Sequence, residues 1–284
     1  ASAFAPGKNP GVMATNTHLE NRLMWAAGVF VPVGSQESVI DSDGNGIEVT
    51  TRVTGLPILR DEGRQLLHVG GSYSHGRRSA NVTIRPRPES FLAPRYLDTG
   101  EIGVGSFNLF AAEVAWVNDQ FSLQGEYAVA HAGDVENISD GRTGRATMHG
   151  GYVQANYFLT GEHRIYNYEK GAFGQVYPNR NFGLRQSRRG PGAWEIAARL
   201  SRIDLDDGPV SGGIQTNLSL GLNWYLNPSI RTSLNFIHAN VNTADVEGEA
   251  NIIQLRFQLD CSPKGIGEFR PAHVINNLRS SGSK

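Results

Sequence analysis

The sequence predicts an all-β protein, a transmembrane antiparallel β-barrel, and three observations support this prediction. Apolar and polar side chains alternate in repeated runs of about ten residues. Short polar turns separate the runs, and the chain has 34 glycines. The runs match the roughly 9–11 tilted residues that cross a membrane, whereas strands of soluble proteins are usually roughly 5–6 residues long. A soluble β-sandwich, which also alternates, is the competing fold.

The composition fits a barrel and excludes several other classes. The mean hydropathy is −0.33, and no stretch approaches the roughly 18 unbroken apolar residues of a membrane helix. Barrel strands average out as neutral because lipid-facing and lumen-facing residues alternate. The net charge of −1 gives no reason to expect nucleic acid as a partner. The single cysteine, Cys261, excludes a disulfide framework and a cysteine-rich zinc site.

The clearest run covers residues 214–226, where leucines and Trp224 share one face and polar residues such as Gln215 and Asn217 share the other. Asn227 and Pro228 then make a turn, since proline fixes φ and asparagine tolerates turn conformations. Further strands are predicted at 11–18, 22–31, 47–56, 65–75, 105–117, 120–131, 147–159, 193–204, 231–241 and 250–259. We therefore expect about eleven strands in one barrel domain, residues 1–260, and a disordered tail, residues 261–284.

The connections alternate in length, as they do in outer-membrane barrels. Short turns at 19–21, 118–119 and 227–228 are expected on the periplasmic side, and long loops at 32–46, 76–104, 132–146, 205–213 and 242–249 on the outer side. The segment 160–192 breaks this rule, because about thirty residues lie where a short periplasmic turn is expected. It holds either no further strand or a hairpin of 163–169 with 173–177, which would raise the count to thirteen.

Aromatic residues gather near the predicted strand ends. Trp116 and Phe121 flank one short turn and Trp224 flanks another. This position is typical of the aromatic belts at membrane interfaces. His149 and His163 are expected to be interfacial or wall residues.

Several stretches resemble the phosphate-selective porin O and P family. They are YVQANYFLTGEHR at 152–164, GAWEIAARLSRIDL at 192–205, GLNWYLNPSIR at 221–231 and ANIIQLRFQLD at 250–260, with RPE at 87–89 and LDTG at 97–100. The resemblance runs from about Pro6 to Asp260. It implies a sixteen-stranded outer-membrane barrel, usually trimeric, which passes anions such as phosphate or polyphosphate. The lipid bilayer and lipopolysaccharide are the other expected partners.

Two features depart from the family pattern. The expected count of eleven to thirteen strands is lower than sixteen, and AFAPGKNPGVMA near the start resembles an internal part of the pattern. We therefore expect the chain to be a C-terminal portion that lacks the first strands. Family members close the last strand on an aromatic residue, where this chain has Cys261.

A channel performs no bond chemistry, so its working residues are the charges along its wall and mouths. The alternation of side chains along each strand places two sets of charged residues on the polar face. They are Arg22, Arg52, Arg199 and Arg256, and Glu48, Glu113, Glu126 and Glu195. The two signs balance. These residues therefore either line an anion path or form ion pairs that brace the wall.

Basic clusters are expected at the pore mouths. The outer loop 76–104 holds Arg77, Arg78, Arg85, Arg87 and Arg95, and the segment 180–189 holds Arg180, Arg185, Arg188 and Arg189. Fixed cations at a mouth concentrate anions, and arginine contacts phosphate oxygens in pairs. The alternatives are a solvated loop and a loop that binds acidic lipopolysaccharide groups.

No metal, cofactor or catalytic site is predicted. The stretch DSDGNG at 41–46 has the opening spacing of a calcium loop, but Arg52 stands where the bidentate acid should fall. The chain has no Walker loop, G-x-S-x-G elbow or H-E-x-x-H helix. We expect a passive channel for small hydrophilic solutes; the alternatives are a non-selective barrel and a soluble β-structured binding protein without channel activity.

Overall fold

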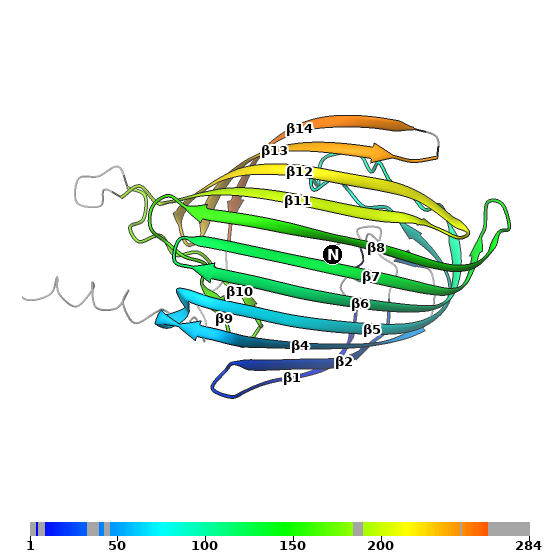
Figure 1. The fold of residues 1–284 in the computed structure, drawn as a ribbon, viewed down its shortest axis with the longest axis horizontal. Coiled ribbons are helices and arrows are strands. Elements are labelled where there is room, and N and C mark those ends of the chain that lie inside the picture. Colours follow the sequence, from blue (N-terminus) through cyan, green and yellow to red (C-terminus); the bar gives the residue numbers. More distant parts are fainter. Residues whose placement is uncertain are drawn as a thin grey trace, which may run out of the picture.

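A computed structural model of the chain describes residue 4 and residues 9–32, 40–42, 46–183, 190–244 and 246–260. One large antiparallel sheet dominates this part of the chain (Figure 1). In spatial order its strands are β1 (Gly11–His18), β2 (Leu23–Phe30), β4 (Gly46–Arg60), β5 (Gln65–Ile84), β6 (Ile102–Asn118), β7 (Phe121–Asn137), β8 (Thr143–Phe158), β11 (Ala193–Asp207), β12 (Val210–Asn227), β13 (Ile230–Asn242) and β14 (Glu247–Leu259). The short β3 (Ile40–Ser42) pairs with β5, and η1 (Asp61–Gly63) is a single 3₁₀ turn. The all-β prediction is confirmed.

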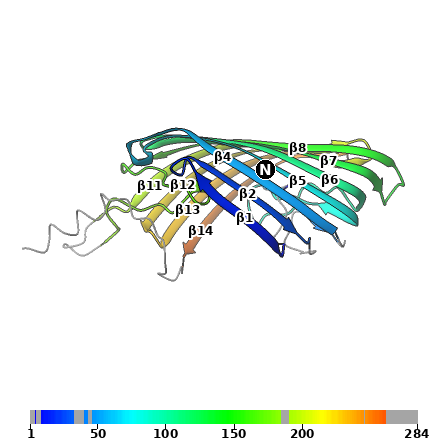
Figure 2. The ribbon, with the colours of Figure 1, turned by 90° about the horizontal axis from the view of Figure 1, so that it is seen from below.

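The sheet is curved and open (Figure 2). β1 and β14 form its two edges, and no pairing joins them within the described ranges. The predicted strands all appear, each paired with its expected neighbour. None of the described residues forms a helix long and apolar enough to cross a membrane.

At the ends that the sequence predicts to be the outer ones, the strands are longer than expected. β5 continues to Ile84, and β11 and β12 are separated only by Gly208 and Pro209. The predicted outer loops 76–104, 132–146 and 205–213 are therefore wrong in extent, because much of each is strand. The backbone remains paired in these parts, but apolar and polar side chains no longer alternate. The pattern from which strands are predicted is therefore absent there.

The loop predicted at 32–46 also contains a strand, β3. Asp41 and Ser42 of the calcium-like stretch lie in this strand, and residues 43–45 lie outside the described residues. No group of three or more metal-ligating side chains occurs in the part of the chain that the structure describes. The predicted tail, residues 261–284, also lies outside it.

The segment between β8 and β11 adds no strand to the main sheet. Its hairpin is short, with β9 (Tyr166–Asn167) paired to β10 (Ala172–Phe173) in a separate two-stranded sheet. Of the two possibilities for 160–192, the structure therefore has a hairpin, but one that folds against the sheet instead of extending it (Figure 1).

The outward face of the sheet is apolar and exposed. On β14, Ile253, Leu255 and Phe257 are 77%, 71% and 68% exposed. Large apolar side chains are likewise exposed on the neighbouring strands, for example Leu200, Leu218, Leu222, Leu234 and Phe236. A continuous apolar surface of this kind must be covered by lipid or by another apolar surface, since soluble monomers rarely expose one. The alternation that the sequence shows is therefore an alternation between a lipid-facing and a polar face.

Aromatic residues border this apolar face near the short turns. Trp116 packs edge to face against Phe121 with ring centres 5.8 Å apart. Trp194 stacks on Trp224 at 5.1 Å, and the indole nitrogen of Trp224 donates to the carbonyl oxygen of Pro191. Rings with a polar handle suit a membrane interface.

Replacement of Leu255 by arginine tests the assignment of the two faces. We expect Leu255→Arg to lower the free energy of unfolding by about 2–4 kcal/mol, the cost of a cation near the middle of the hydrocarbon layer. The control is Asn235→Arg, because Asn235 lies on the opposite face of the adjacent strand and should tolerate a charge. Urea unfolding of the intact chain in lipid vesicles measures both; equal losses for the two variants would contradict the assignment.

Candidate functional site

Two segments fold back across the polar face of the sheet. One is the connection between β8 and β11, residues 159–192, and the other is the connection between β5 and β6, residues 85–101. They come from opposite ends of the strands, because β5 and β8 run in opposite directions and each connection leaves the C-terminal end of its strand. Together they carry most of the contacts that make up the candidate site.

Apolar contacts dock the first segment. Tyr166 of β9 packs into a buried cluster with Leu56, Leu66 and Val117 from β4, β5 and β6. Further along, Val176 packs with Phe158, Ala193 and Tyr225. The segment thus has its own small core against the inner wall.

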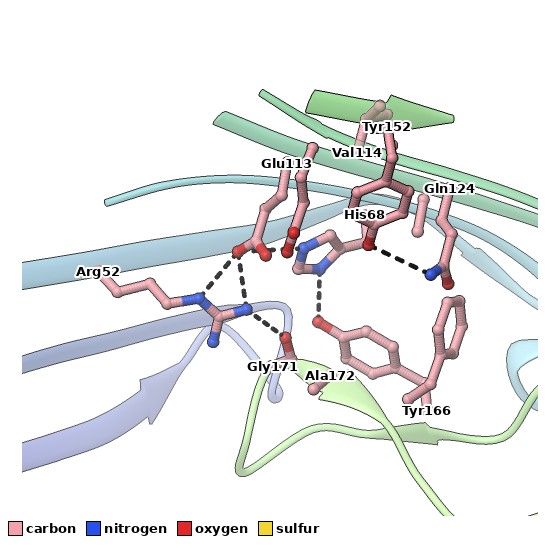
Figure 3. Close-up of a pocket in the computed structure, with 13 residues that line it drawn as sticks. Arg52, His68, Glu113, Val114, Gln124, Tyr152, Tyr166, Gly171 and Ala172 are labelled. Carbon is pink, nitrogen blue, oxygen red and sulfur yellow. Dashed lines mark hydrogen bonds and ion pairs between the residues drawn. The ribbon is translucent and has the colours of Figure 1, made fainter. Parts of the chain in front are cut away.

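Arg52 ties the hairpin to the wall (Figure 3). Its Nε and Nη2 lie 2.8 and 2.7 Å from Oε1 of Glu113 on β6. Its Nη1 donates to the carbonyl oxygen of Lys170 at 3.0 Å, and its Nη2 donates to that of Gly171 at 2.7 Å. One guanidinium therefore connects β4, β6 and the hairpin, and its positive charge is compensated by Glu113.

His68 completes this contact. Its Nδ1 lies 2.7 Å from the hydroxyl of Tyr166, and its Nε2 lies 3.6 Å from Oε1 of Glu113. His68 is buried. Burial raises the pKa of Tyr166 to about 12, so the phenol is neutral and keeps its proton for hydrogen bonding at physiological pH.

A cavity of about 150 Å³ lies between the wall and the hairpin (Figure 3). Its polar lining consists of Arg52, His68, Glu113, Gln124, Glu126, Tyr152 and Tyr166. Glu113 and Glu126 stand directly opposite each other on β6 and β7, and Glu126 forms no ion pair with any residue that the structure describes. Arg52 offsets the charge of Glu113 alone, so the second carboxylate, Glu126, disfavours a phosphate at this point.

Glu195 anchors the start of the same segment and is completely buried. Its Oε1 accepts from Nη2 of Arg164 at 2.5 Å and from the amide of Asn156 at 3.0 Å. Its Oε2 accepts from Asn223 at 3.0 Å and from the hydroxyl of Tyr225 at 2.9 Å. A buried charge with this many partners is a structural ion pair.

The second segment is tied to the wall through Glu89 and Ser90. Glu89 Oε1 lies 2.7 Å from Nε of Arg199 on β11, and Ser219 on β12 donates its hydroxyl to Glu89 Oε2 at 2.5 Å. Ser90 donates to the side-chain oxygen of Gln254 on β14 at 2.8 Å. Leu97 and Tyr96 of the segment pack into a large apolar cluster with inward-facing residues of the outer strand ends.

The structure brings the predicted wall residues into several separate contacts. Arg52 and Glu113 form one pair, whereas Arg199 pairs with Glu89 and Glu195 pairs with Arg164, partners that the sequence did not suggest. Arg256 is exposed and lies on the same face of β14 as Gln254, whose side chain accepts a hydrogen bond from Ser90 of the segment 85–101. Arg22 lies in the turn before β2 and not on a strand. Glu48 lies on the same face of β4 as Arg52, where it is buried and accepts from the hydroxyl of Ser74 at 2.5 Å.

The arginines predicted to lie at the pore mouths are found in different environments. Arg77 and Arg78 are not in a loop, because β5 extends past them. Arg85 lies 4.0 Å from Asp98, and Arg87 donates to the carbonyl oxygen of Ala93 while its guanidinium lies over the ring of Phe91. Arg95 is half-buried and Arg180 is exposed. Arg185, Arg188 and Arg189 lie outside the described residues.

Sequence reasoning missed His68, Arg164 and Tyr166. His68 shares the parity of Ser72 and Ser74 on β5, so the strand pattern gave a signal for its inward position. Arg164 and Tyr166 lie in a segment without periodicity. Glu89 lies in a loop without periodicity, and its partner Arg199 is 110 positions away, so the sequence gives no signal for this contact.

Comparison with known proteins gives a family. The model of the family described as phosphate-selective porin O and P matches residues 5–261. Porin O of Pseudomonas aeruginosa is 25% identical over 276 residues, which cover 85% of this chain and 59% of that protein. An uncharacterized protein of Caulobacter vibrioides is 28% identical over 210 residues, 70% of this chain and 40% of the relative. The chain thus spans about three fifths of the length of Porin O.

The family match covers most of the chain, and the all-β sheet has the lipid-facing and polar faces of an outer-membrane protein. The chain belongs to the phosphate-selective porin O and P family, whose members are proteins of the outer membrane.

Proposed function

We propose that the protein is a porin, a passive diffusion channel for small hydrophilic solutes. The observation that supports this most is the division of the sheet into an exposed apolar face and a polar face crossed by two folded-in segments. A polar face turned toward a lumen provides a path for hydrated solutes, whereas the apolar face requires lipid. Transport of this kind needs no bond chemistry and no cofactor, so we expect no enzymatic activity.

The proposed solutes are anions such as phosphate or polyphosphate. The family description and the arginines on the polar face support this choice. Arg52 and Arg199 are each paired with a carboxylate, so anion preference depends on cations such as Arg256 and on any charge that the inward segments release. Arg22, Arg95 and Arg180 are further cations that we propose for the anion path and its mouths.

The proposed assembly is a homotrimer in the lipid bilayer, with lipopolysaccharide around its outer rim. The proposed domain boundary follows the last strand, with residues 1–260 in the barrel. Support for an assembled or longer barrel comes from β1 and β14, whose edges have no partner in the described ranges. Exposed backbone groups cannot be satisfied by lipid.

Planar-bilayer recording tests the channel and its selectivity. In a gradient of potassium chloride we expect a reversal potential of the sign that chloride permeation gives, and inorganic phosphate should reduce the chloride current. The matched control is the Arg256→Glu variant, which should shift the reversal potential toward potassium because it reverses a charge on the polar face. A wild-type pore that prefers potassium would refute the anion assignment while leaving the channel intact.

A further inference from the structure

The contact between Glu89 and Arg199 has the geometry of a bound oxyanion. The carboxylate of Glu89 accepts from the guanidinium of Arg199 through one oxygen and from the hydroxyl of Ser219 through the other. A guanidinium beside a hydroxyl is also a donor set for a free carboxylate or phosphate. The loop therefore places its own anion where a solute anion would bind.

The wall side of this contact is fixed independently of Glu89. The guanidinium carbon of Arg199 lies 3.6 Å from the ring centre of Tyr152, and Nη1 of Arg199 donates to the side-chain oxygen of Gln154 at 3.3 Å. Stacking on a ring and a second hydrogen bond hold the guanidinium plane in place. Arg199 therefore remains oriented when Glu89 leaves.

On the loop, the backbone conformation of Glu89 is unfavourable. Glu89 has a φ of 56°, in the left-handed region that a residue with a Cβ rarely adopts. Its side chain and that of Arg199 are 18% and 27% exposed, so solvent reaches the pair. Strain of this type persists only where contacts hold it, and it is common at switch positions.

The space around the pair is large enough for a solute. A cavity of about 350 Å³ is lined by Glu89, Arg199 and Ser219, with the side chains of Gln154, Asn223 and Asn235. A water molecule takes about 30 Å³ of liquid, so the cavity accommodates an anion together with several waters. The amides of Asn223 and Asn235 are neutral, and Glu89 is the acid in its lining.

We propose that Arg199 and Ser219 form an oxyanion-binding site, which Glu89 of the inward segment 85–101 occupies as a built-in competitor. A phosphate or carboxylate solute then binds by displacing Glu89, which frees the tip of the segment from the wall. The tethered carboxylate lowers the apparent affinity by the fraction of time that the site is occupied. The proposal deepens the proposed channel function, on which its transport role rests, but binding itself is measurable without transport.

Binding of inorganic phosphate to the intact chain in detergent micelles, followed by ³¹P NMR, tests the proposal. We expect Glu89→Ala to bind phosphate on the order of tenfold more tightly than the parent protein, since the competitor is gone. Asp140→Ala is the control, because it removes one negative charge from an exposed pair with Arg142 outside the lining of this site and should change the affinity little. The double variant Glu89→Ala/Arg199→Gln should lose the gain, and Ser219→Ala should weaken phosphate binding in the Glu89→Ala background.

Three results would overturn the proposal: no gain in Glu89→Ala, an equal gain in Asp140→Ala, or a gain that persists without Arg199. The unfolding midpoint of each variant shows whether the chain is still folded, and Glu89→Gln, which keeps the side-chain size and removes the charge, repeats the test if the alanine variant is unstable. Failure of the channel function is recognised separately, as an absence of conductance in planar bilayers with phosphate binding intact.

Discussion

Replacing Glu195 by alanine is expected to lower the free energy of unfolding by about 3–5 kcal/mol, the usual result of removing one partner from a buried ion pair. The variant leaves the guanidinium of Arg164 without its carboxylate and removes the acceptor of Asn156, Asn223 and Tyr225. All of these groups lie at the junction of the wall with the segment 159–192. We therefore expect that segment to detach along with the loss of stability.

Urea unfolding in lipid vesicles and the rate of tryptic cleavage at the exposed Lys170 measure the two effects. Asp140→Ala is the control, because the pair of Asp140 with Arg142 is on the surface, where solvent screening leaves an ion pair little effect on stability. Glu195→Gln, which keeps the shape and removes the charge, should fall between the two. Equal stabilities of the Glu195→Ala and Asp140→Ala variants would show that the buried carboxylate has no anchoring role.

Replacing Arg52 by glutamine should release the hairpin β9–β10 from the wall. The variant loses the ion pair with Glu113 and the two hydrogen bonds to the carbonyl oxygens of Lys170 and Gly171. A net loss of about 1–2 kcal/mol in docking raises the detached population by about 5–30-fold. Because the hairpin lies across the polar face, its release should also increase the single-channel conductance.

Cleavage at Lys170 and planar-bilayer conductance follow the hairpin in this variant. Arg64→Gln is the control, since Arg64 and Asp119 form an exposed pair 3.3 Å apart near a short turn. It removes the same charge without touching the hairpin. If Arg52→Gln and Arg64→Gln are cleaved at the same rate and conduct equally, the hairpin is held by its apolar contacts alone.

The sequence predicts the sheet well because one periodicity determines it. Lipid contact requires an apolar side chain at every second position, so strands such as β12 are visible in residues 214–226 alone. The same reason explains the errors at the outer strand ends. The part of β5 around Arg77 lacks the regular apolar alternation, so its sequence resembles a loop although its backbone is paired.

The candidate site is less predictable, because its contacts join residues that are far apart in sequence. The alternation along β4 and β6 correctly predicts that Arg52 and Glu113 face the polar side, and their ion pair agrees with the prediction of ion pairs along the wall. The alternation cannot predict that Arg199 pairs with Glu89 or that Glu195 pairs with Arg164, because Glu89 and Arg164 belong to segments without a repeating pattern. Such segments are held by a few specific contacts, which only the folded chain brings together.

The order of strands in the sheet has a consequence for how the chain reaches its final form. Neighbours in the main sheet follow one another along the chain at nearly every step, apart from β3, and the step from β8 to β11 encloses residues 159–192. Closing that ring costs roughly 2–3 kcal/mol more chain entropy than a tight turn. We therefore expect the sequential pairing of neighbouring strands during folding to be slow at the step from β8 to β11. The strands β1–β8 and β11–β14 should then form as two cooperative units before they pair with each other.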